Sequence, residues 1–245
     1  MRNIYRTDGS VEGFFTAVFD AYQDGNAYLT SSSCFQQELF DNFLSVSPNE
    51  EKAKRVLKKL YSLSKQGTRE IFSILRTSEE DKEQAAFLYA KKIVRCGGSA
   101  RSRLTDPAVR RALDLSGRVW TEVHRLKGFL RFRETAEGVF YAPCSPDNDV
   151  IELVMPHFIE RFQGNSFVIH DVKRAIAGMY NGKESMLVSV KEAEISFSKK
   201  ELAFSALWKK YYKTVNIQSR KNLRQQKNYM PVRYWSMLTE ELYEE

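Results

Sequence analysis

The spacing of apolar residues predicts helices in seven parts of the chain. In these parts apolar residues recur every three or four positions, which is the period of one helix face. Ser47, Pro48 and Glu50 add a helix start, because they supply a cap, a proline at the first helical position and a carboxylate that returns to the cap. The predicted helices are residues 11–22, 47–64, 68–75, 78–94, 106–127, 149–162 and a long final helix that Ser198 caps.

Shorter segments follow the two-residue period of a strand, and their order indicates the fold class. We therefore expect an α+β fold with a helix-rich N-terminal half, a small and mostly antiparallel sheet in the second half, and a long C-terminal helix that closes the core. We expect one domain over 1–245, and the only division we consider is a helical part at 1–100 and an α+β part at 101–245. The predicted strands are residues 3–8, 28–30, 43–46, a hairpin of 130–133 with 139–142, and 166–170, 174–180 and 185–190.

The final helix has two opposite faces. On a wheel of 100° per residue one face is basic, with its cations within about 60° of Lys209. The other face is apolar, and we expect it to be buried. Beyond Ile217 this apolar side becomes polar, so the helix there either needs no core or meets a polar partner. The basic face holds Lys209, Lys213, Arg220, Arg224 and Lys227, and the apolar face holds Phe204, Leu207, Trp208, Tyr211, Tyr212 and Val215.

Positive charge is concentrated in two segments of the chain. Residues 199–235 hold ten Lys and Arg against one acid, a net charge of +9, and residues 101–133 hold nine against three, a net charge of +6. The whole chain carries +7, so the remainder is net acidic. Two basic segments in an otherwise acidic protein favour a polyanionic partner, although a chance cluster of solvated cations is the alternative.

The overall composition narrows the class of protein. An aromatic content of 13% argues against a disordered chain,. We expect neither a secretory signal nor a membrane span, since no window approaches the roughly 18 apolar residues that a span needs. Cys34, Cys96 and Cys144 are far apart and form neither a disulfide framework nor a metal motif, which favours a cytoplasmic location,.

The C-terminal basic segment contains the side-chain types that bind nucleic acid. Cations contact phosphates, amides contact base edges, and aromatic faces stack on unpaired bases. Asn222, Gln225 and Gln226 supply the amides, and Tyr229 supplies an aromatic face. The alternative is that Tyr234 and Trp235 fold back onto the core. The nucleic-acid-binding candidates are Arg125, Lys127, Arg131, Arg161, Arg174, Lys209, Lys213, Arg220, Asn222, Arg224, Lys227, Arg233, Tyr234 and Trp235.

Catalytic chemistry has weaker support. His124 and Glu122 could act as a general acid and base, but residues two apart project about 200° apart on a helix, so cation binding is favoured there. His170 and Asp171 form a doublet like that of metal-dependent phosphohydrolases, yet they fall on a predicted strand without further spaced ligands. Neither a phosphate-binding glycine loop, a dinucleotide fingerprint nor a nucleophile elbow is present. We expect no metal and no cofactor.

Six motifs, in order, resemble a DNA-metabolism protein family. Members of that family are typically encoded beside a radical-SAM protein of DNA repair or modification, and some carry a C-terminal uracil-DNA glycosylase domain. The chain is similar to the short form that lacks the glycosylase, and it has no three-cysteine cluster of its own. The motifs are DGSVEGFFTAVFDAY (8–22), EVHRLKGFLRF (122–132), PHFIERF (156–162), HDVKR (170–174), LWKKYYKTVNIQSRKN (207–222) and MPVRYWSMLTE (230–240).

The resemblance implies a cellular context and no catalytic residue. Combined with the basic segments, it predicts a DNA-binding accessory protein that works with a radical-SAM partner, with DNA preferred over RNA and without a membrane. Two alternatives stay open. One is an enzyme that acts on a nucleotide or nucleic acid through a basic pocket with His124 and Asp171, and the other is a protein adaptor that docks the partner enzyme.

Overall fold

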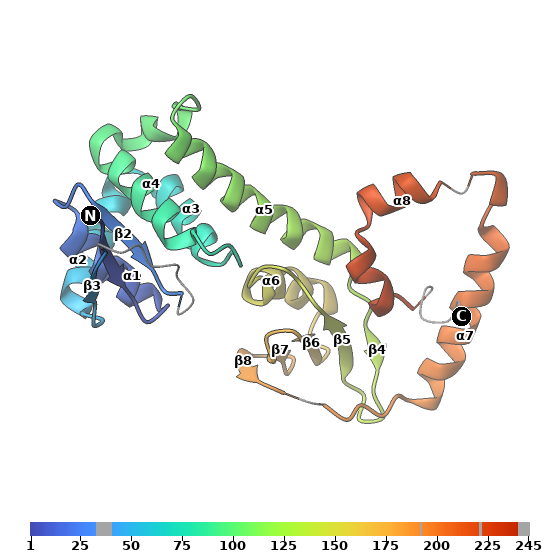
Figure 1. Cartoon of the computed structure of the whole chain (residues 1–245). Helices are drawn as coiled ribbons and strands as arrows, with labels where there is room; N and C mark the ends of the chain where they lie inside the picture. Colours follow the sequence, from blue (N-terminus) through green and yellow to red (C-terminus); the bar gives the residue numbers. More distant parts are fainter. Residues whose placement is uncertain (33–40, 192, 221, 240–245) are drawn as a thin grey trace. The chain divides into compact units, whose positions relative to one another are not determined.

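The computed structural model of the protein describes residues 1–32, 41–191, 193–220 and 222–239 (Figure 1). Cys34 and Lys221 lie outside the described residues. The chain divides into two compact units, Met1–Trp120 and Thr121–Glu245. Within the described ranges, no helix combines the length and the apolar character that crossing a bilayer requires.

The first unit combines a small parallel sheet with a group of helices. Strand β1 (Asn3–Arg6) pairs in parallel with β2 (Ala27–Thr30) on one side and with β3 (Asn42–Ser45) on the other. The three strands lie where the sequence predicts them, while the parallel pairing was not predicted. The helices are α1 (Val11–Ala21), α2 (Glu50–Leu63), α3 (Lys65–Leu75), α4 (Lys82–Cys96), the 3₁₀ turn η1 (Gly97–Ser102) and α5 (Pro107–Phe129), which runs on into the second unit.

Helix starts in the first unit follow from side chains that satisfy free backbone N–H groups. Ser10 caps α1 by accepting from the backbone of Gly13 at 2.9 Å. The predicted cap of α2 at Ser47 is wrong, because Asn49 accepts from Lys52 N at 3.0 Å and caps the helix instead. The backbone N–H of Asn49 also donates to Thr16 Oγ1 of α1 at 3.0 Å, so a tertiary contact selects the cap.

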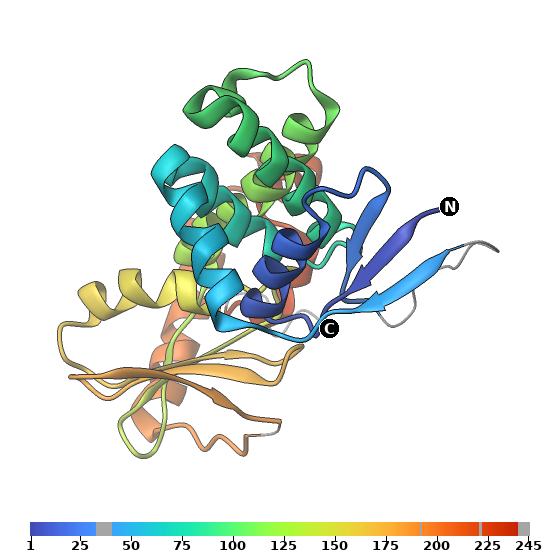
Figure 2. The same cartoon turned by 90° about the vertical axis from the view of Figure 1, so that its left-hand side faces the viewer.

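The second unit contains a five-stranded sheet in the order β4-β5-β6-β7-β8. Strands β5 and β6 are parallel and are joined through α6, and every other neighbouring pair is antiparallel. Helix α6 lies against one face of this sheet (Figure 2). The strands are β4 (Arg133–Glu134), β5 (Phe140–Cys144), β6 (Phe167–Asp171), β7 (Ile176–Tyr180) and β8 (Ser185–Ser189), and α6 spans Ile151–Phe162.

Aromatic rings fill the space between α6 and the sheet. The Phe132 ring centroid lies 4.7 Å from that of Phe162 and 4.9 Å from that of Phe158. Phe167 of β6 completes the cluster at 5.2 Å from Phe162. The α+β class, the hairpin and the mostly antiparallel sheet predicted for the second half are confirmed.

The C-terminal part differs from the single long helix that the pattern predicts. Helix α7 (Lys199–Val215) ends where Asn216 adopts an extended backbone, with φ −71° and ψ 117°. A 3₁₀ turn η2 (Gln218–Arg220), helix α8 (Leu223–Tyr229) and a second 3₁₀ turn η3 (Val232–Met237) follow. The predicted continuous basic stripe is therefore divided among three elements, because the chain changes direction between Val215 and Leu223.

The apolar face of α7 is exposed, which corrects the expectation that this helix closes the core. None of the residues of this fully described helix is buried, and Phe204 and Leu207 are 62% and 66% exposed. The helix is tied to the sheet at its start, where Ser198 Oγ donates to Glu134 Oε2 at 3.0 Å and Glu134 N donates to Glu201 Oε2 at 3.1 Å. The pattern correctly identified an apolar face, but the prediction that this face is buried is wrong.

Candidate nucleic-acid interface

A buried carboxylate organises the C-terminal segments of the second unit. Glu122, on α5, is 2% exposed. Its Oε1 accepts a hydrogen bond from the backbone N–H of Asp147 at 2.9 Å, and its Oε2 accepts from Asn148 N at 2.8 Å and Asn148 Nδ2 at 2.7 Å. Two further donors come from η3, namely Tyr234 Oη at 2.9 Å and Arg233 Nη2 at 3.0 Å, both to Oε1. The carboxylate therefore joins α5, the 147–148 loop and η3.

The hydrogen bonds keep this carboxylate ionised. Burial raises the pKa of the Glu122 carboxyl, but the donors on Asp147, Asn148 and Tyr234 outweigh it, so that the pKa lies below its usual range,. Burial and the negative charge of Glu122 raise the pKa of the Tyr234 hydroxyl, which therefore stays a donor. The pair is a stable anion and a stable neutral phenol at neutral pH.

The same network fixes the orientation of η3. Arg233 Nη1 pairs with Asp147 Oδ2 at 2.9 Å, and its guanidinium lies 4.8 Å from the centroid of the Tyr234 ring. The Tyr234 ring lies 5.9 Å from the ring of Phe129 at the end of α5. Trp235 Nε1 donates to the carbonyl of Met230 at 3.0 Å, which closes the turn. Trp235 is thus placed by its neighbours on both sides.

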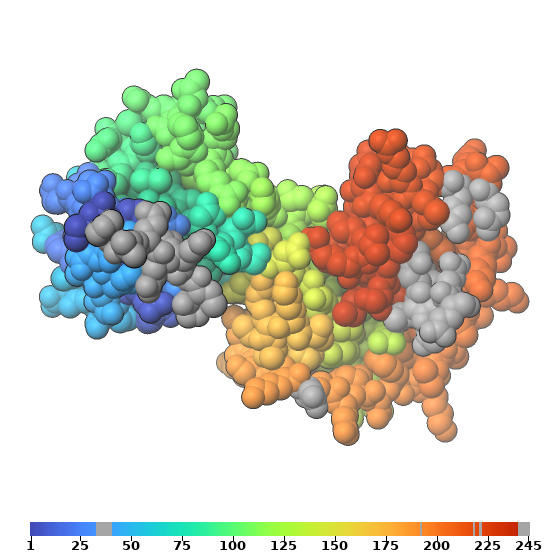
Figure 3. All heavy atoms as spheres, viewed as in Figure 1, coloured from blue at the N-terminus to red at the C-terminus, as the bar shows by residue number. Residues whose placement is uncertain are grey.

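A cavity of about 510 Å³ opens beside Trp235. Its wall is made by the end of α5, the end of α7, η2, α8 and η3, and Figure 3 shows α8 and η3 in red as one continuous surface. The chemistry of the wall is mixed, with one guanidinium, four amides and several aromatic rings. The lining residues are Phe129, Tyr212, Asn216, Arg220, Asn222, Leu223, Gln225, Gln226, Tyr229, Met230 and Trp235.

The break in the predicted final helix is what forms this cavity. Asn222 caps α8, with its Oδ1 accepting from Gln225 N at 3.0 Å, so α8 starts in a new direction. This brings Arg220 and Asn222 to the same wall as Tyr229, which is 73% exposed. Of the other predicted cations, Lys213, Arg224 and Lys227 are exposed on these elements, whereas Lys209 is half-buried.

The remaining predicted binding residues lie on α5 and directly after it, on α6, and in the turn between β6 and β7. Arg125, Lys127 and Arg131 are half-buried near the end of α5, and Arg161 is exposed on α6. Arg174 is already engaged, because it donates to the carbonyls of Pro146 and Asp147 and pairs with Asp171 Oδ2 at 2.9 Å.

Two of the predicted binding residues take part in the network instead of facing a ligand. Tyr234 is 3% exposed, so its ring cannot stack on a base, and this assignment is corrected. Arg233 pairs with Glu122 and Asp147. The alternative reading of the sequence, in which the end of the chain folds back onto the core, is therefore right for Tyr234.

The three catalytic candidates have different surroundings. Glu122 is occupied by its donors, and His124 is exposed, as the angle between them on the helix requires. Asp171 is 0% exposed, and its Oδ1 accepts from the backbone N–H groups of Lys173 at 3.0 Å and Arg174 at 3.1 Å. These contacts make Glu122 and Asp171 structural acceptors.

His170 likewise has a structural role. Its Nδ1 is hydrogen-bonded to the Tyr141 hydroxyl at 2.8 Å, and its Nε2 lies 3.0 Å from the carbonyl of Val190. Both ring nitrogens are therefore engaged within the sheet. Among the described residues, no group of three or more His, Cys, Asp or Glu side chains could hold a metal ion.

Part of the cavity wall and of the Glu122 network was not predicted from the sequence. Phe129 and Asn216 lie within the quoted motifs but were not predicted as binding residues, and Tyr212 was expected on a buried helix face. Asn148 and Asp147 follow a proline in a loop, and nothing local links them to Glu122. The cations and amides of this segment, and the end of the apolar pattern after Ile217, were the signals in the sequence that pointed to a polar site here.

Comparison with known proteins gives one family. Neither a search of the curated proteins nor a search of the solved structures found a match to this chain. A family model described as a domain of unknown function, DUF4130, matches residues 80–240, which include the whole cavity wall and the Glu122 network. The chain therefore belongs to the DUF4130 family.

Proposed function

We propose that the protein binds single-stranded nucleic acid and holds one unstacked base in the cavity beside Trp235. The observation that carries the proposal is the composition of the cavity wall, which combines amide side chains, aromatic faces and Arg220 in about 510 Å³. Sites for small ligands have volumes of roughly 300–1,000 Å³, so the cavity has the right order of size for a base.

Each part of the wall matches one part of a nucleotide. Amide side chains such as Asn222 and Gln225 present both a donor and an acceptor, which is the pattern that base edges require. Aromatic faces such as Tyr229 and Trp235 stack on bases that have left a duplex. Arg220, in the wall, and Arg224, exposed on the adjacent α8, supply positive charge for the flanking phosphates,.

The cellular context is part of the proposal and comes from the resemblance of the sequence motifs. On that basis the nucleic acid is DNA, the process is repair or modification, and the partner is a radical-SAM enzyme that this protein assists. An association that survives nuclease treatment and high salt, after co-expression with such an enzyme, supports a direct partner. An association lost with nuclease would mean that nucleic acid alone connects the two.

Catalysis by this chain finds no comparable support. Glu122 and Asp171 accept hydrogen bonds that hold the fold together, and both are buried. A general base has to reach a substrate proton, and neither group has a free path to one in this arrangement. The accessory role is therefore the function we propose.

Fluorescence anisotropy with a labelled single-stranded oligonucleotide and its duplex, across a salt series, tests the proposal. The Arg220→Glu/Arg224→Glu variant should weaken single-strand binding and lower the slope of log K against log salt by about 1.4, since each phosphate contact on a single strand contributes about 0.7. The matched control is Lys58→Glu/Arg95→Glu, which makes the same charge change at exposed positions of the first unit.

The outcomes separate site-specific binding from a general charge effect. Binding that collapses in the Arg220/Arg224 variant and persists in the control supports the cavity. Equal weakening in both variants would mean that only net charge matters, and would refute the assignment of the site. Absence of binding by the wild type at low salt would refute the proposed function itself.

A further inference from the structure

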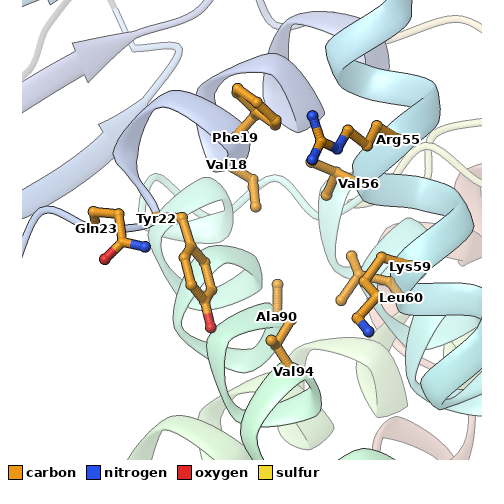
Figure 4. A pocket seen from close by; sticks show the side chains of 10 residues that line it. All are labelled: Val18, Phe19, Tyr22, Gln23, Arg55, Val56, Lys59, Leu60, Ala90 and Val94. Atoms are coloured by element: carbon orange, nitrogen blue, oxygen red, sulfur yellow. The ribbon is translucent and has the colours of Figure 1, made fainter.

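A second cavity, of about 380 Å³, lies within the first unit between α1, α2 and α4. Figure 4 shows the three helices around an open space, with side chains of α1 on one side, those of α2 on the other, and Ala90 and Val94 of α4 below. Nothing in the nucleic-acid proposal uses this cavity. The lining residues are Val18, Phe19, Tyr22, Gln23, Arg55, Val56, Lys59, Leu60, Ala90 and Val94.

The base and walls of this cavity are apolar. Val18, Leu60 and Ala90 are 4%, 1% and 1% exposed, so they belong to the core and form a firm base. Val56 and Val94 add branched aliphatic walls. Such a surface favours a hydrocarbon or aromatic body, because its burial removes apolar area from water on both sides.

Two cations of α2 border the same cavity. Arg55 and Lys59 are four residues apart and therefore lie on one face of the helix, one turn from each other,. The Arg55 guanidinium lies 5.6 Å from the centroid of the Phe19 ring, which keeps it at the edge of the cavity. Among the lining residues there is no acid, and among the described residues no carboxylate is paired with Lys59.

We infer that this cavity binds an amphipathic anion, with its hydrocarbon chain between α1, α2 and α4 and its head group at Arg55 and Lys59. The apolar base favours a hydrocarbon body over a wholly polar ligand such as a sugar,. The two cations exclude a positively charged amphiphile and favour a carboxylate or a phosphate head. Carboxylate and phosphate are both negatively charged, so either head group can pair with Arg55 and Lys59.

The volume indicates the length of the chain. A cavity of about 380 Å³ is roughly thirteen times the about 30 Å³ that one water molecule occupies in the liquid, and a methylene group is of similar size,. A chain of about ten carbons fills most of that space. Each buried methylene contributes about 0.8 kcal/mol, a factor of about four in affinity, until the cavity is full.

Isothermal titration calorimetry with hexanoate, octanoate and decanoate, each below its micelle concentration, tests the chain. We expect affinity to rise about fourfold per methylene along this series. Decyl phosphate and decan-1-ol test the head group. Decan-1-ol should bind more weakly than decanoate, by about twofold to fivefold for each cation with which it forms no ion pair. This factor corresponds to the free energy of a partly exposed ion pair. The tighter of decanoate and decyl phosphate identifies the head group.

Variants locate the binding. Val56→Trp fills the cavity from α2 and should abolish decanoate binding, and Arg55→Gln/Lys59→Gln should reduce it to the level of decan-1-ol. Lys58→Gln, an exposed neighbour on the same helix that does not line the cavity, is the matched control and should bind like the wild type. Circular dichroism on each variant confirms that the helices are intact.

Three results would overturn the inference. These are no heat of binding with any of the chains, equal affinity for decanoate and decan-1-ol, and decanoate affinity in the double Gln variant equal to that of Lys58→Gln. The double variant changes only side chains at the edge of the cavity, so it decides the question even if Val56→Trp does not fold. Oligonucleotide binding, measured in parallel, should be the same in all of these variants.

Discussion

Replacing the Glu122 carboxylate by an amide should strongly destabilise the second unit. Glu122→Gln keeps the size and shape of the side chain but removes its charge and one of its two acceptor oxygens. In the native protein, Oε1 accepts from Asp147 N, Arg233 and Tyr234, and Oε2 accepts from the backbone and the side chain of Asn148. Whichever oxygen becomes an NH₂ group, at least two of these donors then face another donor.

The size of the effect follows from that number of lost bonds. A hydrogen bond to a charged group contributes about 1.5–3 kcal/mol, so the loss of two gives a decrease of about 3–6 kcal/mol in the free energy of unfolding. Domains have a total stability of about 5–15 kcal/mol, so this is a large fraction. For an m-value of about 2 kcal/mol/M in urea, the unfolding midpoint should fall by roughly 1.5–3 M.

Urea unfolding followed by tryptophan fluorescence measures this effect. The chain has three tryptophans, so a Trp120→Phe/Trp208→Phe background leaves Trp235, which lies next to the network, as the only reporter. Glu160→Gln, an exposed position on α6, is the matched control and should shift the midpoint by less than about 0.3 M,. A similarly small shift in Glu122→Gln would refute the view that this carboxylate holds η3 in place.

Three further predictions concern binding, pH and backbone conformation. Tyr229→Ala should weaken single-stranded oligonucleotide binding by about 5- to 150-fold, the equivalent of about 1–3 kcal/mol for one stacked base, and leave the melting temperature unchanged. Anisotropy measures the binding and calorimetry measures the melting temperature. A change in affinity below twofold would show that Tyr229 is not part of the site. The pKa of the Glu122 carboxyl is lowered from its ordinary 4.5, so its contribution to stability is complete above pH 4.5 and is lost as the pH falls through the folded-state pKa,. The urea midpoints of the wild type and of Glu122→Gln should therefore converge as the pH is lowered towards 3. A difference between the two midpoints that stays constant from pH 7 to pH 3 would contradict this prediction. Gly182→Ala should destabilise the protein by roughly 1–3 kcal/mol, since φ at this position is +91° and a Cβ would lie 2.3 Å from the carbonyl oxygen of Gly164,. Gly25→Ala is the control, because a Cβ there meets nothing within 4 Å. Equal thermal unfolding of the two variants would show that the turn at Gly182 relaxes.

Local periodicity was sufficient to find the elements, because each helix or strand depends mainly on neighbours in the chain. Helices α1, α5 and α6 lie close to their predicted ranges, and so do the strands other than β4, which occupies Arg133–Glu134 instead of the predicted 130–133. Cap selection was harder. Ser47 and Asn49 are both good cap residues, and the choice was made by Thr16, 33 positions away, through a contact that no local pattern encodes.

The site depends even more on distant contacts. The wheel that placed Arg220 and Lys227 on one stripe assumed a continuous helix, but neither glycine nor proline marks the break near Asn216. Composition identified the amides and cations of the cavity, whereas their arrangement follows from the break. The buried role of Tyr234 depends on Glu122, 112 positions earlier, and sequence spacing says nothing about such a pair.

The separation between Glu122 and its partners has a consequence during synthesis on the ribosome. The strands of the first unit lie within the first 45 residues, so that sheet can assemble early. Glu122 and Arg233 are 111 positions apart, which at about 5–20 residues per second is a delay of roughly 6–22 s,. Throughout that interval the nascent chain carries a carboxylate whose last donors have not been translated. The second unit can therefore complete its folding only after η3 has been synthesised. A chain that ends before η3 leaves the Glu122 carboxylate without these donors, and chaperones and proteases can recognise such an incompletely folded chain.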